Sequence, residues 1–252
     1  MALTPKMFLI VCPMLFLAGF VDSIAGGGGL ISLPAYLFAG LPVHTAIGTN
    51  KLSSSCGTAL TTARFIRGGL IRWKLALPGI GAAMLGSSLG SRISLLADEK
   101  LIRGVLFVVL PLAAFIVLNP RLFPERQEKE VTVNARTIAV CVVAALVIGF
   151  YDGFYGPGTG TFLIIAFTAF GKLSVSAANA HAKVINLTTN ITSLIVFLHG
   201  GTVLIPLGLA AAACNMLGNY IGSGLAMRGG AKITRPIILI VLFMLLIKLL
   251  TD

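Results

Sequence analysis

Residues 19–29 read Gly-Phe-Val-Asp-Ser-Ile-Ala-Gly-Gly-Gly-Gly, and residues 149–160 read Gly-Phe-Tyr-Asp-Gly-Phe-Tyr-Gly-Pro-Gly-Thr-Gly. In both copies an apolar run of about 13 residues leads into the motif, and an apolar run of about 10 residues follows it. As helices, these runs reach only roughly 15–20 Å, whereas the hydrocarbon core of a bilayer is about 30 Å thick. Each copy therefore predicts a glycine-broken helical element, either re-entrant or discontinuous, in which neither run crosses a membrane alone.

The composition indicates a membrane protein. The chain has 252 residues, of which 57% are hydrophobic and only 11% charged, against roughly a quarter charged in soluble domains. Apolar runs near 20 residues recur along its whole length, so we expect an all-α polytopic membrane protein without a soluble domain. The net charge of +11 comes from basic residues near the ends of apolar runs. Membrane topology explains that placement, and we expect no nucleic-acid partner.

The glycine motif is one part of a longer internal repeat. With an offset of 132 residues, Lys51 falls on Lys183, and Gly90-Ser91 falls on Gly222-Ser223. Near the motif itself the offset is 130, which matches Asp22 with Asp152. We therefore divide the chain into a first transmembrane repeat (1–118), a charged linker (119–136) and a second transmembrane repeat (137–252). Each repeat is expected to hold the glycine-broken element followed by three transmembrane helices.

The positions of the basic loops predict the orientation of the two halves. In the first half, one short loop region carries four basic residues, Arg64, Arg67, Arg72 and Lys74, whereas its counterpart at 199–202 has neither lysine nor arginine. In the second half the basic loop is the next one along, with Arg228, Lys232 and Arg235. If both basic loops are cytoplasmic, the halves are inverted repeats.

Four charged residues lie within the apolar segments, in two equivalent pairs: Asp22 with Asp152, and Lys51 with Lys183. A charge at membrane depth costs at least roughly 2.5–3.5 kcal/mol, so we expect the four to share a polar centre. The aspartates either cap half-helices or pair with the lysines, or else they carry a coupling proton. For the lysines we predict direct contact with an anion, because an ammonium group is a compact point charge.

The glycine breaks predict further contacts with the same anion. Helices that begin at 28–30 and at 159–161 would direct free backbone N–H groups and the positive ends of their dipoles toward it. His181 is a candidate for proton coupling or for a structural hydrogen bond. The predicted substrate-binding residues are Gly27, Gly28, Gly29, Thr49, Asn50, Lys51, Gly158, Thr159, Gly160, His181, Lys183 and Asn186. We expect no catalytic residue, metal or cofactor.

Two further stretches complete a family pattern. Together with the glycine motifs, Thr-Asn-Lys-Leu at 49–52 and Ala-His-Ala-Lys-Val-Ile-Asn at 180–186 resemble the TauE/SafE family of membrane transporters over nearly the whole chain. The resemblance implies movement of sulfite, of sulfonates such as sulfoacetate, or of related sulfur oxyanions. It also implies a multi-pass protein of the bacterial cytoplasmic membrane.

These observations favour a secondary transporter for a small organosulfur anion, working by alternating access with proton or ion coupling. A passive anion channel built on the same basic centre is the alternative. An intramembrane enzyme is the least favoured class, because the sequence lacks a His-Glu-x-x-His motif and its embedded acids are the two symmetric aspartates. The glycine-rich segments 75–96 and 204–227 pack either within the chain or against a second copy in a homodimer.

Overall fold

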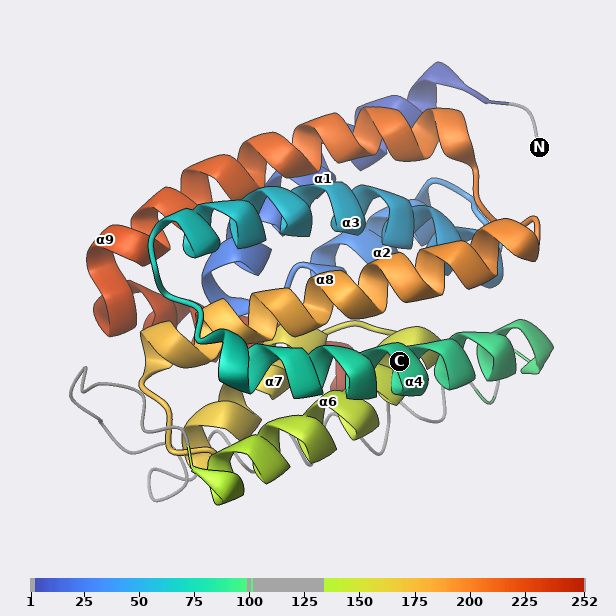
Figure 1. The fold of residues 1–252 in the computed structure, drawn as a ribbon. Helices are drawn as coiled ribbons and strands as arrows, with labels where there is room; N and C mark the ends of the chain where they lie inside the picture. Colours follow the sequence, from blue (N-terminus) through green and yellow to red (C-terminus); the bar gives the residue numbers. More distant parts are fainter. Residues whose placement is uncertain (1–2, 99–100, 102–133, 252) are drawn as a thin grey trace.

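The computed structural model describes residues 3–98, 101 and 134–251, and every regular element in this part of the chain is an α-helix (Figure 1). The helices are α1 (Pro5–Ala25), α2 (Gly29–Phe38), α3 (Val43–Arg67), α4 (Trp73–Leu96), α6 (Ala135–Phe154), α7 (Thr159–Ala169), α8 (Val175–His199) and α9 (Ile205–Thr251). The span expected at 102–118 and most of the linker at 119–136 lie outside the described residues. The all-helical fold class is confirmed for the part described.

The first helix of each half is longer than we predicted. α1 has 21 residues and α6 has 20, which gives each a length of about 30 Å. Both are long and apolar enough to cross a membrane. The predicted run ended where the glycine motif begins, but α1 continues through Asp22 to Ala25. The charge of Asp22 is tolerated inside the helix because Lys183 pairs with it. Only the second segments are half-length, with 10 residues in α2 and 11 in α7.

The glycine-rich faces of α4 and α9 pack within this chain, against the first helix of the opposite half. A Cβ atom built on Gly86 or Gly90 would lie 2.2 or 2.0 Å from a backbone oxygen of α6. A Cβ on Gly218 or Gly222 would lie 2.0 Å from Phe16 O or 2.4 Å from Phe20 O of α1. Only glycine permits this approach of two backbones. The contact between α9 and α1 therefore repeats the contact between α4 and α6. Both contacts join the first half of the chain to the second.

Helices α3 and α8 lie antiparallel and side by side in the middle of the bundle (Figure 1). Near the start of α3, a Cβ on Gly48 would lie 2.6 Å from Thr202 O, just beyond the end of α8. Near the end of α3, the hydroxyl of Thr62 donates to Lys183 O, near the start of α8. Both helices have 25 residues, and their ends match at the repeat offset of 132. The two membrane lysines are therefore carried on a matched central pair of helices.

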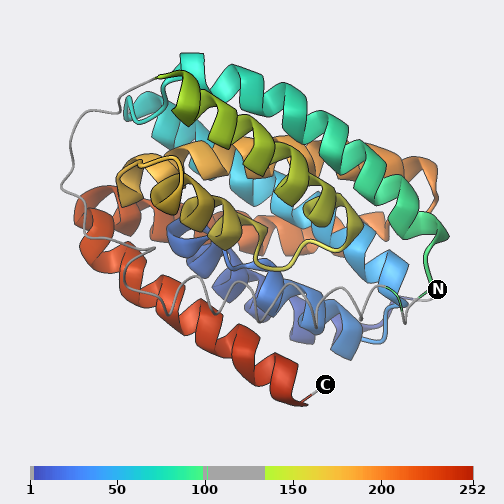
Figure 2. The same ribbon diagram turned by 90° about the horizontal axis from the view of Figure 1, so that it is seen from below.

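The last described helix takes the place of two expected spans. α9 is a single helical stretch of 47 residues, about 70 Å of helix, where two membrane spans separated by a basic loop were predicted. Figure 2 shows that it turns back along its course instead of running straight. Its sequence contains Gly229-Gly230 and Pro236, residues that commonly cause helix bends.

Candidate functional site

Two buried ion pairs join the halves at the centre of the bundle. Lys51 Nζ on α3 lies 2.8 Å from Asp152 Oδ2 on α6, and Lys183 Nζ on α8 lies 2.7 Å from Asp22 Oδ2 on α1. Each lysine therefore pairs with the aspartate of the other half. The side chains are nearly closed off from solvent, with 2% and 3% exposure in the first pair and 0% and 13% in the second. Pairing with the lysines, one of the alternatives left open for the aspartates, is thus the arrangement found.

The two glycine breaks meet each other beside these ion pairs. Gly26 has a φ of +76°, and a Cβ atom there would lie 2.2 Å from the carbonyl carbon of Gly160. Gly26 O accepts a hydrogen bond from the Thr161 N–H at 3.3 Å, and Ala25 O accepts one from Thr161 Oγ1 at 2.7 Å. The end of α1 is therefore fastened to the start of α7, so the breaks of both halves form one central junction.

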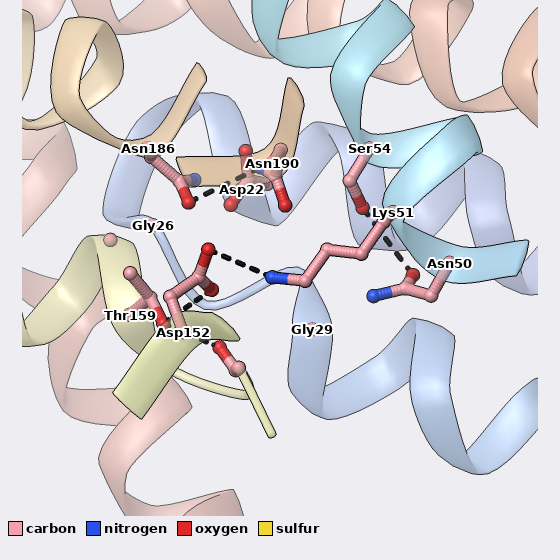
Figure 3. A pocket seen from close by; sticks show the side chains of 12 residues that line it. Asp22, Gly26, Gly29, Asn50, Lys51, Ser54, Asp152, Thr159, Asn186 and Asn190 are labelled. Atoms are coloured by element: carbon pink, nitrogen blue, oxygen red, sulfur yellow. Dashed lines mark hydrogen bonds and ion pairs between the residues drawn. The ribbon is translucent and has the colours of Figure 1, made fainter. Parts of the chain in front are cut away.

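A small polar cavity lies at this junction (Figure 3). It leaves about 20 Å³ for the centres of water-sized molecules, roughly enough for one water. Asn50, Lys51 and Ser54 of α3 and Asn186 and Asn190 of α8 line it, together with both aspartates. The remaining lining residues are Gly26, Gly29, Gly156, Thr159 and Gly160. The first residues of α2 and α7, Gly29 and Thr159, are among them, which agrees with the predicted helix starts.

The cavity contains most of the predicted site residues and several others. Gly29, Asn50, Lys51, Thr159, Gly160, Asn186 and the two aspartates line it, whereas Gly27, Gly28, Thr49, Gly158, His181 and Lys183 do not. Four lining residues are absent from the predicted set: Gly26, Ser54, Gly156 and Asn190. Helical spacing could have found two of them, because Ser54 lies three residues after Lys51 and Asn190 lies four after Asn186.

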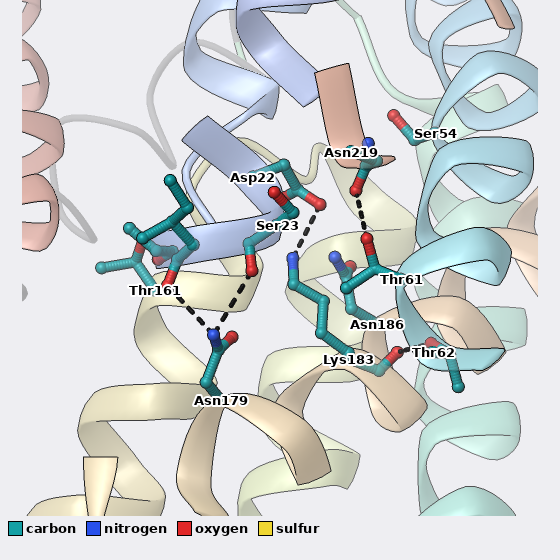
Figure 4. Close-up of polar contacts among 12 residues, drawn as sticks. Asp22, Ser23, Ser54, Thr61, Thr62, Thr161, Asn179, Lys183, Asn186 and Asn219 are labelled. Atoms are coloured by element: carbon teal, nitrogen blue, oxygen red, sulfur yellow. Dashed lines mark hydrogen bonds and ion pairs between the residues drawn. The ribbon is translucent and has the colours of Figure 1, made fainter. Parts of the chain in front are cut away.

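Lys183 does not line the cavity, and its polar contacts join neighbouring helices (Figure 4). Its ammonium group binds Asp22, and its backbone carbonyl accepts from Thr62 Oγ1 at 3.2 Å. One turn earlier on α8, Asn179 Nδ2 donates to Ser23 O and Ile24 O at 3.3 and 3.0 Å. The second half is thereby bound to the end of α1.

His181 and Thr49 occupy equivalent places in the repeat and make equivalent contacts outside the cavity. His181 Nε2 accepts the backbone N–H of Arg72 at 3.1 Å, and Thr49 Oγ1 accepts that of Leu204 at 3.0 Å. Arg72 immediately precedes α4, and Leu204 immediately precedes α9. Because a backbone N–H only donates, the ring proton of His181 lies on Nδ1, which donates to Ala177 O at 2.8 Å. Both side chains thus hold the start of a helix of the other half.

We expect Thr49→Val, which keeps the shape but removes the acceptor, to lower the free energy of unfolding by about 1–3 kcal/mol. Thermal unfolding of the detergent-solubilised protein measures this. Thr49→Ser is the control, because it keeps the hydroxyl and should stay close to the wild type. An equal loss in both variants would assign the effect to packing instead of the hydrogen bond.

Residues 11–249 match the family model described as "Sulfite exporter TauE/SafE". The chain belongs to the TauE/SafE family. This confirms the resemblance found in the sequence motifs, and the match includes both glycine breaks and both membrane lysines.

Among the curated relatives of this TauE/SafE protein, one from Sinorhizobium sp., named "Probable membrane transporter protein ORF9", is 37% identical over 94% of this chain and 90% of its own length. "Probable membrane transporter protein YfcA" of Escherichia coli K12 is 33% identical over 99% of this chain and 91% of its own. A "Probable membrane transporter protein" of Haemophilus influenzae is also 33% identical, over 94% and 92%. No solved structure matches the chain.

Proposed function

We propose that this TauE/SafE protein is a secondary transporter that moves a small organosulfur anion, such as sulfite or sulfoacetate, across the bacterial cytoplasmic membrane. The observation that carries the proposal is the central cavity, where the ammonium group of Lys51 lies among amide and hydroxyl groups. Asn50, Ser54 and Asn190 can each donate a hydrogen bond to an oxyanion. The family description names sulfite, and the relatives are named as membrane transporters.

The size of the cavity supports alternating access. A volume that holds roughly one water molecule is too small for an anion with a sulfur atom and three oxygens. The groups that line it come from both halves of the chain: from α1, α2 and α3 of the first half and from α6, α7 and α8 of the second. We infer that the halves move apart to admit the anion from one side of the membrane and then from the other.

The ends of the helices support an inverted arrangement of the two repeats in a multi-pass membrane protein. The antiparallel course of α3 and α8 places the basic end of α3 beside α9. There Arg64 donates to Ser223 Oγ at 2.9 Å, and a Cβ on Gly68 would lie 3.0 Å from Met227. Arg228, the residue after Met227, lies on the same helix. The basic regions of both halves thus share one end of the bundle, which we assign to the cytoplasmic side.

Flux of radiolabelled sulfite and sulfoacetate into proteoliposomes tests the proposal. We expect uphill movement driven by an imposed proton gradient. Ser54→Leu, which fills the cavity while keeping both ion pairs, should abolish it. Ser88→Leu is the matched control, because Ser88 lies on α4 away from the cavity and should leave flux intact. Flux that only runs downhill would identify a passive anion channel, and the absence of any sulfur oxyanion flux would refute the proposed substrate class.

A further inference from the structure

The buried charges at the centre sum to zero. In the described part of the chain, the buried aspartate, glutamate, lysine and arginine side chains are Asp22, Lys51, Asp152 and Lys183. They form two neutral pairs, so an anion that entered the cavity would add an uncompensated negative charge. In a low-dielectric surrounding this is costly unless a positive charge accompanies it. A proton taken up by a carboxylate supplies one such positive charge without any other ion, and it lowers the excess negative charge even when the anion is a dianion.

The two ion pairs differ in their access to the cavity. Lys51 and Asp152 both line it, whereas in the second pair only Asp22 does. A Cβ built on Gly156 would lie 3.1 Å from Lys51 Nζ and 3.0 Å from Asp152 Oδ1, so any larger residue at this position would crowd the pair. Lys183, by contrast, lies on the stretch of α8 that is fastened to α1 and α3 through Asp22 and Thr62. An anion can reach the first lysine without breaking the contacts of the second.

The aspartates also differ in their neighbours. Thr159 Oγ1 lies 2.7 Å from Asp152 Oδ1 and equally 2.7 Å from Gly156 O. A hydroxyl has one proton to donate and can also accept. It can therefore donate to Gly156 O while it accepts a hydrogen bond from the protonated carboxyl group of Asp152. At the repeat offset of 130 the residue equivalent to Thr159 is Gly29, which has no hydroxyl to offer Asp22. Within the described residues, the repeat thus gives Asp152 a neighbour that suits both its charged and its protonated form, and Asp22 lacks that neighbour at the equivalent position.

We propose that the Lys51–Asp152 pair opens to receive the anion and that Asp152 takes up one proton as it leaves Lys51, while the Lys183–Asp22 pair stays closed. This deepens the proposed function and rests on it. The proton comes from water on the side where the anion enters and forms an O–H bond on the Asp152 carboxylate. It returns to water on the other side when the anion leaves and Lys51 binds Asp152 again. Besides Lys51, the charged groups at this centre are Asp22 from α1 and Lys183 from α8.

The experiment counts protons and sulfoacetate together. Sulfoacetate is a suitable probe because its sulfonate and its carboxylate are both ionised at neutral pH, so the anion itself carries no proton. Proteoliposomes with a trapped pH-sensitive dye report proton entry, and radiolabelled sulfoacetate reports the anion. Equilibrium binding of the same label to detergent-solubilised protein is measured in parallel. Two double variants, Lys51→Met with Asp152→Asn and Lys183→Met with Asp22→Asn, each replace one whole pair, so that no charge is left buried alone.

We expect the wild type to move one proton with each sulfoacetate. The Lys51→Met/Asp152→Asn variant should bind sulfoacetate at least about 100-fold more weakly. For each sulfoacetate that it binds, the Lys183→Met/Asp22→Asn variant should still take up one proton, because Asp152 and Lys51 are unchanged. Asp152→Asn alone should bind sulfoacetate without proton uptake.

Three results would overturn the proposal. Equal loss of binding in both double variants would show that the pairs act alike. Sulfoacetate flux by the wild type without proton entry would refute the role of Asp152 as proton carrier. The proposed transporter function would not be affected by that result. Absence of sulfoacetate binding in the wild type, together with absence of any sulfur oxyanion flux in the transport assay above, would refute the proposed function itself, and this inference with it.

Discussion

Gly26→Ala is expected to abolish the folded protein. The added Cβ would lie 2.2 Å from the Gly160 carbonyl carbon and 2.5 Å from its Cα, and these are backbone atoms that cannot turn aside. The φ of +76° adds strain. Because the same contact joins the ends of the two glycine breaks, relief of the clash would separate α1 from α7. We expect a loss of more than about 4 kcal/mol, visible as the absence of a monodisperse species in detergent and of cooperative thermal unfolding.

Two other glycines separate the clash from the ordinary effects of adding a methyl group. Gly69 has a φ of +67°, and a Cβ there would meet nothing within 4 Å. Gly69→Ala should therefore cost only the backbone strain of about 1–2 kcal/mol. Gly81 is helical and equally open, so Gly81→Ala should leave stability unchanged or slightly raise it. If Gly26→Ala lost no more stability than Gly69→Ala, the close approach of Gly26 to Gly160 described above would be wrong.

Lys183→Met alone is expected to destabilise the protein by about 3–5 kcal/mol, because it leaves the Asp22 carboxylate without its counter-charge in the core. Adding Asp22→Asn should recover most of that loss, since the double variant buries no charge. Thermal unfolding of the wild type, both single variants and the double variant measures the coupling energy between the two residues. The effect should be insensitive to salt, because the pair is closed off from solvent.

The outcome that would contradict this prediction is additivity. If the two single substitutions simply summed in the double variant, Asp22 and Lys183 would not depend on each other. The equivalent cycle with Lys51 and Asp152 should show coupling of similar size, because the two nitrogen–oxygen distances differ by only 0.1 Å (2.8 and 2.7 Å).

Much of the fold follows from the repeat and from the positions of glycine. The offset of 132 residues predicts that α3 and α8 are equivalent helices, and it is matched by their bounds, Val43–Arg67 and Val175–His199. The starts of α2 and α7 are predictable because glycine lacks a Cβ and interrupts an apolar run at the same place twice. Helix lengths are less predictable, since the reach of α1 past Asp22 depends on a partner 161 residues away.

The candidate site, like the fold, is predictable from the sequence only in part. The sequence by itself determined that Asp22, Asp152, Lys51 and Lys183 are buried together, because charges within apolar segments need one another. Only the tertiary structure decided that each lysine pairs across the two halves and that the glycine faces of α4 and α9 are used within the chain. It also decided that Thr49 and His181 hold helix starts instead of facing the cavity. Periodicity fixes which residues share a helix face, but the residues that oppose that face depend on how two distant helices dock.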